Sequence, residues 1–281
     1  MSFWEALVLG GVQGATEFLP VSSSGHLVIF EALMGLSLPG VSFEIAVHVA
    51  TLVSVLLVYR GRVARLVTGA LGRDPDAWRY LGLLALATVP AALVGVLLGD
   101  AVRVLFDVPA VAGVALLVTG GLLWSIRGIL RRERGADGVA EATASRVAPG
   151  IAHGLTVPSV SQAVLMGLAQ AFALIPGISR SGTTVVVGLW VGVEATEAAA
   201  FSFLMAVPAI AGAAILQLLV APSGGANGDL PVLAAAFVTA AVVGVLAIRA
   251  FVALLAHRSF HRFALYCWVA GGSFLLWLGL V

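Results

Sequence analysis

Long apolar runs separated by short polar segments dominate the pattern of this chain. A helix needs about 20 apolar residues to cross the hydrocarbon layer of a membrane, and several runs approach that length. These longer runs lie near 44–59, 80–98, 108–126, 201–221, 231–250 and 263–281. We therefore expect an all-α polytopic membrane protein, in which the short runs near 3–19 and 27–34 and the runs at 150–175 and 184–193 do not cross on their own.

Two compact polar motifs interrupt the shorter runs. The first extends from Gln13 to His26 (QGATEFLPVSSSGH), and the second from Pro176 to Thr184 (PGISRSGTT). Each contains a proline that ends one apolar helix, followed by small hydroxyl residues that favour the start of another. We therefore expect two re-entrant helix-loop-helix hairpins, one within 3–34 and one within 150–193.

Composition supports the membrane class and narrows the chemistry. Hydrophobic residues make up 60% of the chain and charged residues 10%, with a mean hydropathy of +1.09, far from the balance of a soluble domain. A net charge of +1 gives no basic surplus for nucleic acid, which we exclude as a partner. Cys267 is the single cysteine, so an intramolecular disulfide and a cysteine metal cluster are excluded. The first apolar run contains Glu5 and lacks a basic leader, which argues against a cleavable signal peptide.

The arginines predict the orientation, because short cytoplasmic loops collect them. They cluster within 60–79, 127–146 and 249–262. We expect these three segments in the cytoplasm, and the arginine-poor segments 99–109 and 222–230 on the outer side.

The two halves of the chain share a plan. A shift of 156 residues places Leu19 on Ile175, Pro20 on Pro176 and Ser23 on Ser179. The spans that follow each motif then cross in opposite directions, which is the signature of an inverted-topology repeat whose polar sites meet near the membrane midplane. We expect a single transmembrane domain with a first half at 1–126, a cytoplasmic linker at 127–149 and a second half at 150–281.

The first motif combines a carboxylate with a helix start. Gln13 and Glu17 are four residues apart and therefore lie on one helix face. Ser22, Ser23, Ser24 and Gly25 supply hydroxyls and backbone amides at the start of the next helix, which favours an anion such as phosphate. His26 stands one turn into that helix.

The second motif adds a cation to the same plan. Arg180 is able to hold phosphate through two parallel hydrogen bonds. Its neighbours are a breaking glycine and a set of hydroxyl donors, namely Gly177, Ser179, Ser181, Thr183 and Thr184. A carboxylate, an imidazole and an arginine inside membrane-spanning sequence indicate a functional site, and together they suit a phosphate ester on a lipid.

Small residues in membrane helices also serve close packing, which is our interpretation of Gly10, Gly11, Gly120 and Gly121. His48 has only Glu44 and Thr51 as polar neighbours at helical spacing, and we interpret it as an interior histidine outside the site.

At these motifs the chain resembles the undecaprenyl-diphosphate phosphatase family, the integral membrane phosphatases associated with bacitracin resistance. The family's first signature is matched from Gln13 through Glu17, Pro20 and the serines to His26. Its second, PGxSRSxxT, is matched from Pro176 to Thr184. Weaker resemblance extends through Thr88–Gly95 and Phe201–Pro208 and so covers nearly the whole chain. Gln13 departs from the glutamate of many members, which makes Glu17 the more critical ligand.

The resemblance implies hydrolysis of a polyprenyl diphosphate lipid, undecaprenyl diphosphate, to undecaprenyl phosphate and inorganic phosphate, with Mg²⁺ or another divalent cation such as Ca²⁺. We expect Arg180 and the hydroxyls to bind the diphosphate, and Glu17 with Gln13 to hold the metal. Either Ser23 or His26 attacks the terminal phosphorus or activates water, and the sequence leaves the three nucleophiles open. The expected location is the bacterial cytoplasmic (inner) membrane, among its lipids, with a site that opens outward.

A transporter of a polyprenyl phosphate is the alternative, because inverted repeats with broken helices are also the plan of many carriers. A carrier would not need a metal ligand beside a nucleophile, so the enzyme is favoured. The sequence leaves a homodimer open.

Overall fold

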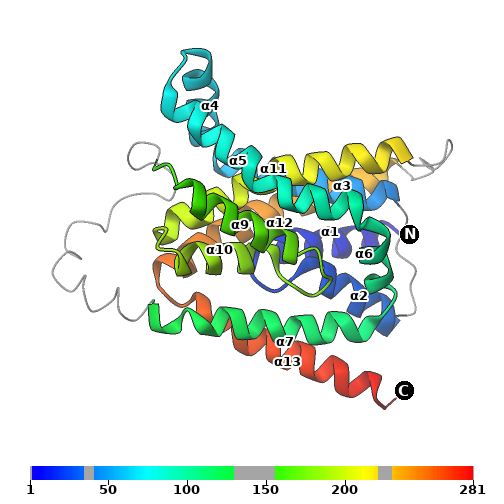
Figure 1. Cartoon of the computed structure of the whole chain (residues 1–281). Coiled ribbons are helices and arrows are strands. Elements are labelled where there is room, and N and C mark those ends of the chain that lie inside the picture. Colours follow the sequence, from blue (N-terminus) through cyan, green and yellow to red (C-terminus); the bar gives the residue numbers. More distant parts are fainter. Residues whose placement is uncertain (1, 35–40, 130–155, 221–229, 281) are drawn as a thin grey trace.

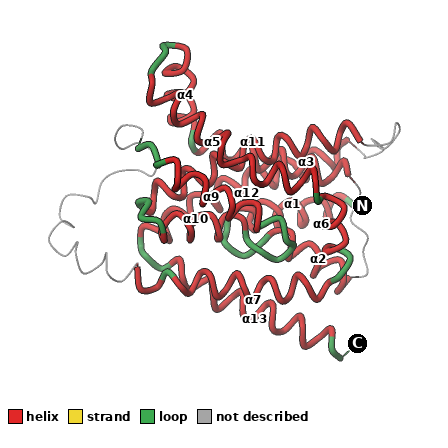
Figure 2. The backbone as a smooth tube through the Cα atoms, in the orientation of Figure 1, coloured by secondary structure: helices red, strands yellow, loops and turns green. Residues whose placement is uncertain are grey.

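The computed structural model describes residues 2–34, 41–129, 156–220 and 230–280. Within these residues the chain forms helices and connecting loops with no strand (Figure 2). The helices are α1 (Phe3–Phe18), α2 (Ser23–Met34), α3 (Val41–Val58), α4 (Arg60–Leu71), α5 (Pro75–Leu97), α6 (Gly99–Phe106), α7 (Pro109–Ser125), α9 (Val160–Phe172), α10 (Arg180–Trp190), α11 (Ala195–Val220), α12 (Leu230–Ala256) and α13 (Phe263–Leu278), with a 3₁₀ turn at Phe260–Arg262. Most of the predicted linker at 127–149 lies outside the described residues.

Four of the described helices are long and apolar enough to cross a membrane, namely α5, α7, α11 and α12. The pair α3 and α4 qualifies together, although it bends by 79° at Tyr59. The protein is therefore a multi-pass, all-α membrane protein, as the hydropathy pattern predicts. At 16 residues, α13 is shorter than a full crossing.

The arginine-rich segment after α3 differs from the predicted loop. It forms the helix α4, and Arg62 on that helix is buried. The guanidinium donates to both carboxylate oxygens of Glu197 at 2.6 Å and lies 5.7 Å from the centre of the Tyr80 ring. A buried arginine needs such a partner, and it joins α4 to the first turn of α11.

Two outer layers of helices lie on either side of the hairpins and α12. In Figure 1, α7 and α13 pack side by side along one edge, and α3, α5 and α11 pack together along the opposite edge. The hairpins α1–α2 and α9–α10 lie between them, where α1 packs on α12 and α9 packs on α5. Both polar motifs are therefore enclosed by apolar helices.

Both hairpins begin with the same cap. The Ser2 hydroxyl accepts from the N–H of Glu5 at 3.2 Å, and the Glu5 carboxylate accepts from the N–H of Ser2 at 2.9 Å. Ser159 and Gln162 repeat this reciprocal pair at 3.2 and 2.8 Å. Such capping boxes satisfy amides that have no partner in the first turn of a helix, and they fix where α1 and α9 begin.

These caps correct the register between the halves. The box residues are related by a shift of 157, since Ser2 corresponds to Ser159 and Glu5 to Gln162. At the second helix of each hairpin, the Ser22 hydroxyl accepts from the N–H of Gly25 at 3.2 Å, as Ser179 accepts from Gly182 at 3.2 Å. The predicted shift of 156 aligns Pro20 with Pro176 and is wrong by one residue for the helices, because the caps on both sides of the prolines are related by 157.

The glycines at which α1 and α9 pack closely on neighbouring helices are also related by the shift of 157. A Cβ on Gly10 of α1 would lie 2.4 Å from the carbonyl oxygen of Ala236, and a Cβ on Gly167 of α9 would lie 2.4 Å from that of Ala87. Only glycine allows the backbones to approach so closely. These matched contacts agree with the predicted repeat, whose inverted orientation stays a prediction.

The packing interpretation of the four glycines holds for two of them. Gly10 meets α12, and a Cβ on Gly120 would lie 2.4 Å from the Trp268 indole nitrogen. For Gly11 the nearest atom is a methyl at 3.7 Å, and Gly121 faces open space. The interpretation is wrong for these two, because each lies next to the contact face of its helix and not on it.

A chain of aromatic rings supports the end of α1. Phe18 meets Phe203 edge-on at 5.6 Å between ring centres, and Phe203 meets Phe251 at 5.0 Å. Phe251 continues to Phe260 at 4.9 Å. All four are fully buried. This cluster holds the residue next to Glu17 rigidly, which is what a positioned carboxylate requires.

Candidate active site

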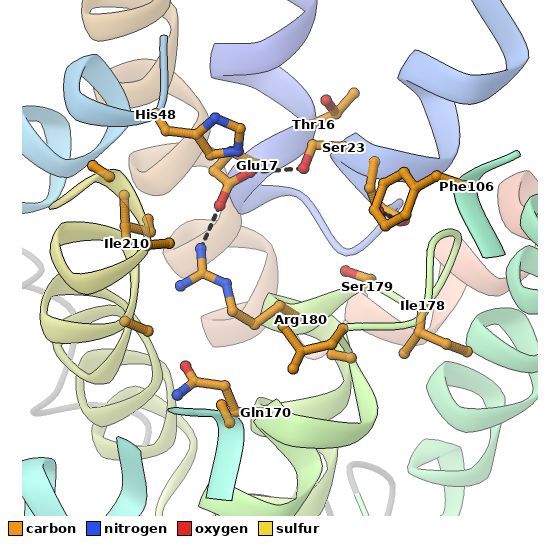
Figure 3. Close-up of a pocket in the computed structure, with 18 of the residues that line it drawn as sticks. Thr16, Glu17, Ser23, His48, Phe106, Gln170, Ile178, Ser179, Arg180 and Ile210 are labelled. Atoms are coloured by element: carbon orange, nitrogen blue, oxygen red, sulfur yellow. Dashed lines mark hydrogen bonds and ion pairs between the residues drawn. The ribbon is translucent and has the colours of Figure 1, made fainter. Parts of the chain in front are cut away.

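Both motifs line one cavity of about 250 Å³ (Figure 3). Glu17 and Ser23 enter it from the first motif, and Ser179 and Arg180 from the second. The remaining walls come from α3, α5, α6, α9 and α11. Segments about 160 residues apart in the chain therefore meet in a single polar chamber inside apolar helices.

Glu17 lies at the junction of the two motifs. Its Oε1 accepts from Nη2 of Arg180 at 2.5 Å, while Oε2 accepts from the Ser23 hydroxyl at 2.7 Å and from Nε2 of Gln13 at 3.0 Å. The carboxylate is buried, and a buried charge of this kind is stable only when it is paired and fully hydrogen-bonded. The three donors fix both oxygens and so fix the side chain.

Ser23 and Arg180 occupy equivalent positions in the two hairpins. Each follows directly after a serine whose hydroxyl accepts from an amide of the first helical turn. The cap turns each chain so that the next side chain faces Glu17, one contributing a hydroxyl and the other a guanidinium. A shift of 157 relates the two residues, so Ser23 corresponds to Arg180 and not to Ser179 as predicted.

The hydroxyls expected to bind substrate divide into two groups. Ser22, Ser24 and Ser179 line the cavity, as Ser23 does. The others do not line the cavity and bond to the surrounding backbone and side chains. The Ser181 hydroxyl donates to the carbonyl oxygen of Leu19 at 3.3 Å. Thr184 contacts the carbonyl of Arg180 at 2.7 Å and the Ser202 hydroxyl at 2.6 Å, and Thr183 is buried. Gly25 and Gly177 do not line the cavity either.

The two glycines bring the motifs into contact. A Cβ on Gly25 would lie 2.9 Å from Cα of Gly177. Gly177 has a φ of +95°, a conformation that residues with a side chain rarely adopt. Thr119 of α7 secures this loop, because its hydroxyl donates to the Gly177 carbonyl at 2.9 Å and accepts from the Ser179 N–H at 3.1 Å. The glycines are therefore structural requirements of the junction.

His26 does not line the cavity. Its Nδ1 is 2.7 Å from the carbonyl oxygen of Ser22, which can only accept, so Nδ1 carries the proton. In the neutral ring Nε2 then accepts from the Tyr266 hydroxyl at 2.6 Å, and the two rings stack at 5.7 Å. Both ring nitrogens are engaged, so this geometry supports a structural part for His26, and its catalytic part stays a prediction.

Four polar residues that line the cavity were not predicted, namely Thr16, His48, Gln170 and Gln217. His48 of α3 lines it, and Figure 3 shows the imidazole next to the Glu17 carboxylate. Its Nδ1 donates to the carbonyl oxygen of Glu44 at 2.7 Å. The interpretation of His48 as an interior histidine outside the site is therefore wrong. Gln170 of α9 also lines the cavity, and the correct shift of 157 would have indicated it as the counterpart of Gln13.

The donor set of the cavity fits a divalent cation that is shared with a phosphate. Glu17 is the acidic side chain that lines it among the described residues, which contain no group of three histidine, cysteine, aspartate or glutamate side chains suited to a metal. Mg²⁺ commonly uses one or two carboxylates and takes its other oxygens from phosphate and water. Gln13 does not line the cavity and contacts Glu17 through its amide nitrogen, so its predicted part as a metal ligand stays a prediction.

A family model described as bacitracin resistance protein BacA matches residues 6–273. The chain belongs to this family. Among curated relatives of the BacA family, an "Undecaprenyl-diphosphatase" of Desulfosudis oleivorans is 37% identical over 290 residues, covering 98% of each chain. Another of Rubrobacter xylanophilus is 41% identical over 274 residues, covering 93% of each chain. The "Undecaprenyl-diphosphatase 2" of Bacillus thuringiensis is 34% identical, covering 97% of this chain and 96% of the relative.

The BacA match spans both polar motifs and every described helix from α2 to α12 in full. Family membership and the cavity therefore concern the same residues. The two alignments cover 98% and 93% of the length of these relatives.

Proposed function

We propose that this BacA-family protein hydrolyses undecaprenyl diphosphate to undecaprenyl phosphate and inorganic phosphate, which recycles the lipid carrier of cell-wall synthesis. The observation that carries the proposal is the Ser23 hydroxyl held 2.7 Å from a carboxylate that also contacts Arg180. A hydroxyl, a carboxylate and a guanidinium converging inside a membrane protein suit phosphoryl transfer from a lipid. The names of relatives that match over nearly their whole length support the same substrate.

Binding begins with the diphosphate oxygens. Arg180 donates to them from its guanidinium, which holds phosphate more specifically than a point charge does. Serines at the starts of α2 and α10, namely Ser22, Ser23, Ser24 and Ser179, line the same chamber, and the positive ends of these two helices favour an anion. The apolar helices around the site keep bulk water away, which strengthens each of these contacts.

Ser23 is the nucleophile that the geometry favours. Its oxygen attacks the terminal phosphorus, the new O–P bond forms, and the bond from that phosphorus to the bridging oxygen breaks. Undecaprenyl phosphate leaves, and Glu17 takes the hydroxyl proton from 2.7 Å away. Water then attacks the phosphoserine: its oxygen bonds to the phosphorus, the bond from the phosphorus to the Ser23 oxygen breaks, and one water proton passes to that serine oxygen. Glu17 gives up its proton to solvent as inorganic phosphate leaves, which restores the carboxylate and the free hydroxyl.

Glu17 would also hold a divalent cation. Mg²⁺ held there would supply charge neutralisation on the phosphate oxygens and make the phosphorus more electrophilic. The proposal for this chain is that Glu17 supplies the protein oxygen and that Gln13 orients the carboxylate through its amide N–H.

We further propose that the cavity opens to the outer face of the bacterial cytoplasmic membrane. Its lining residues on the spans are Ile45 and His48 near the start of α3, Ala91 in the second half of α5, and a group near the end of α11. Phe106 also lines the cavity, and it belongs to the arginine-poor segment 99–109. The arginine distribution assigns all of these ends to the outside.

Phosphate release from undecaprenyl diphosphate by the purified protein in detergent tests the function. We expect turnover that is lost with a chelator and restored by Mg²⁺ or Ca²⁺. Ser23→Ala should lower kcat by about 10³-fold or more. Ser24→Ala is the matched control, because the Ser24 hydroxyl contacts Ser22 at 3.3 Å and does not contact Glu17, and it should change kcat by less than about tenfold. Equal losses in the two variants would contradict the assignment of Ser23.

Rapid-quench trapping separates the three nucleophiles. An acid-stable phosphoenzyme is expected for Ser23, an acid-labile one would indicate His26, and turnover without an adduct would indicate direct attack by water. Translocation of undecaprenyl phosphate in vesicles without any phosphate release from the diphosphate would favour a transporter.

Orientation is tested in intact cells. A cysteine introduced at Asp100 of α6, in a Cys267→Ser background, should react with a membrane-impermeant maleimide. One introduced at Arg73, in the cytoplasmic cluster, should react only after the cells are opened. The reverse pattern would overturn the outward orientation.

A further inference from the structure

Gln170 is a buried glutamine whose side chain has no hydrogen-bond partner in the described structure. The residue is 2% exposed, and both its Nε2 and its Oε1 are buried and unpaired among the described residues. Buried amide groups are costly to leave unsatisfied and are nearly always paired. Gln170 lines the polar cavity, so the cavity is where its partner must come from.

The Arg180 guanidinium, next to Gln170 in the cavity, also has a donor without an acceptor. Nη2 contacts Glu17, but Nη1 is buried and has no partner among the described residues. Figure 3 shows the Gln170 amide and the Arg180 guanidinium on the same side of the chamber, with Glu17 and Ser23 beyond the guanidinium. Two N–H donors that lack acceptors therefore border one space.

A phosphate group is the ligand that matches these donors, because it presents several strong acceptor oxygens. The two terminal nitrogens of the guanidinium can donate to different acceptors, Nη2 to the Glu17 carboxylate and Nη1 to a phosphate oxygen. Gln170 then donates through Nε2 to the same phosphate. Its Oε1 is left to accept from water or from a hydroxyl of the ligand.

The corresponding glutamine of the first half serves another purpose. Gln13 is related to Gln170 by the shift of 157, but its Nε2 donates to Glu17 at 3.0 Å and it does not line the cavity. One glutamine of the pair orients the carboxylate, and the other keeps its amide free at the cavity wall.

We propose that Gln170 is a substrate-binding residue, which together with Nη1 of Arg180 forms a subsite for the phosphate that remains on the lipid. This inference rests on the proposed function, since only a diphosphate has one phosphate to face Ser23 and a second to accept from Gln170 and from Nη1 of Arg180. The terminal phosphate faces Ser23, and the lipid-linked phosphate faces Gln170. The subsite therefore selects a diphosphate over a single phosphate group.

Gln170→Leu tests the subsite. The volumes are similar and the variant removes the two unsatisfied groups, so folding should be retained, with an unfolding temperature equal to or above that of the wild type. We expect kcat/KM for farnesyl diphosphate and for undecaprenyl diphosphate to fall by about tenfold to a hundredfold, mainly through KM, because a hydrogen bond to a charged group is lost. Gln170→Glu should lose more, because its carboxylate repels the phosphate.

Gln217→Leu is the matched control, since Gln217 of α11 also lines the cavity and has no buried unpaired atom. It should change kcat/KM by less than about threefold. Retention of wild-type KM in Gln170→Leu, or an equal rise of KM in both leucine variants, would overturn the proposal.

Binding of inorganic pyrophosphate by the full-length protein, measured by calorimetry with inorganic phosphate as the comparison, is independent of turnover. The wild type should bind pyrophosphate more tightly than phosphate, and Gln170→Leu should weaken pyrophosphate by about tenfold or more. Unchanged pyrophosphate affinity would mean that Gln170 is satisfied by water alone and would overturn the subsite. Pyrophosphate binding that depends on Gln170, without any lipid hydrolysis, would overturn the proposed function and leave the subsite standing.

Discussion

Gly14 offers a sharp test of how packing positions the site. A Cβ at Gly14 would lie 2.5 Å from the carbonyl oxygen of Ala240 and 3.0 Å from the backbone nitrogen of Gly244, whereas ordinary contact begins at 3.4 Å. Gly14→Ala therefore requires α1 to move away from α12 by about 0.9 Å, the difference between 3.4 and 2.5 Å. Glu17 is one turn further along the same helix and must move with it.

The expected cost follows from this displacement. Overpacking of a tight contact costs about 1–3 kcal/mol, and alanine recovers about 0.8–1 kcal/mol through its higher helix propensity. We expect Gly14→Ala to unfold a few degrees below the wild type in detergent, at about 2–4 °C per kcal/mol. A misplacement near 1 Å can cost about a hundredfold in rate, so kcat/KM for phosphate release should fall by about tenfold to a hundredfold.

Gly11→Ala is the matched control on the same helix. Its Cβ would meet only a methyl group of Thr239 at 3.7 Å, an ordinary contact. We expect equal or slightly higher stability and unchanged kcat/KM. If Gly14→Ala and Gly11→Ala gave the same unfolding temperature and the same kcat/KM, close approach of α1 to α12 would not be what positions Glu17.

Three further predictions concern contacts around the site. Arg62→Ala should destabilise the fold by about 1–3 kcal/mol, because it removes both hydrogen bonds from the buried guanidinium and leaves the partly exposed Glu197 carboxylate unpaired, while the double variant Arg62→Met/Glu197→Leu should recover most of the unfolding temperature. Thr119→Val should lower both activity and unfolding temperature through the loss of two buried hydrogen bonds to the second motif, and Thr119→Ser should retain them. His26→Ala should cost about 1–3 kcal/mol of stability, because it removes one of the two hydrogen bonds to the Ser22 carbonyl and the contact of the ring with Tyr266. Tyr266→Phe should keep phosphate release within about threefold of wild type, and a loss as large as that of Ser23→Ala in this variant would instead assign His26 a part in the chemistry.

The helical architecture could be predicted because the membrane imposes it. Bilayer thickness and the need to satisfy every backbone group leave few options for an apolar chain, so α5, α7, α11 and α12 follow from hydropathy alone. Proline and the serine caps likewise indicate where the hairpins break. The helix α4 could not be predicted in this way, because its arginines suggest a solvated loop until Glu197, far along the chain, supplies a buried partner.

The site was predictable in its residue types and less so in its register. Glu17, Ser23 and Arg180 follow from the motifs, since charged and hydroxyl groups are rare in such segments. A one-residue error in the repeat concealed that Ser23 and Arg180 are counterparts and that Gln170 matches Gln13. The position of His48 depends on the packing of α3 beside α1, a tertiary contact that no local spacing encodes.

Divergence between equivalent positions explains how a repeat produces an active site. If both halves carried the same residue after the cap, the chamber would contain two hydroxyls or two guanidinium groups, and neither set combines a nucleophile with an anion-binding cation. The counterpart of Glu17 under the shift of 157 is Leu174, which also lines the cavity, so the site contains one carboxylate that both hairpins share.

Charge balance in this chamber then bears on the metal. Glu17 and Arg180 neutralise each other at 2.5 Å, so the pair brings no net positive charge to a diphosphate with several negative ones. In a water-poor cavity that imbalance is expensive, because opposite charge is what stabilises a buried anion. A divalent cation held by Glu17 would supply the missing positive charge, while Arg180 keeps Nη2 on the carboxylate and offers Nη1 to a phosphate oxygen. We therefore propose that the Glu17–Arg180 ion pair is the arrangement of the site before the substrate binds, and that a cation held by Glu17 would complement Arg180 in neutralising the diphosphate.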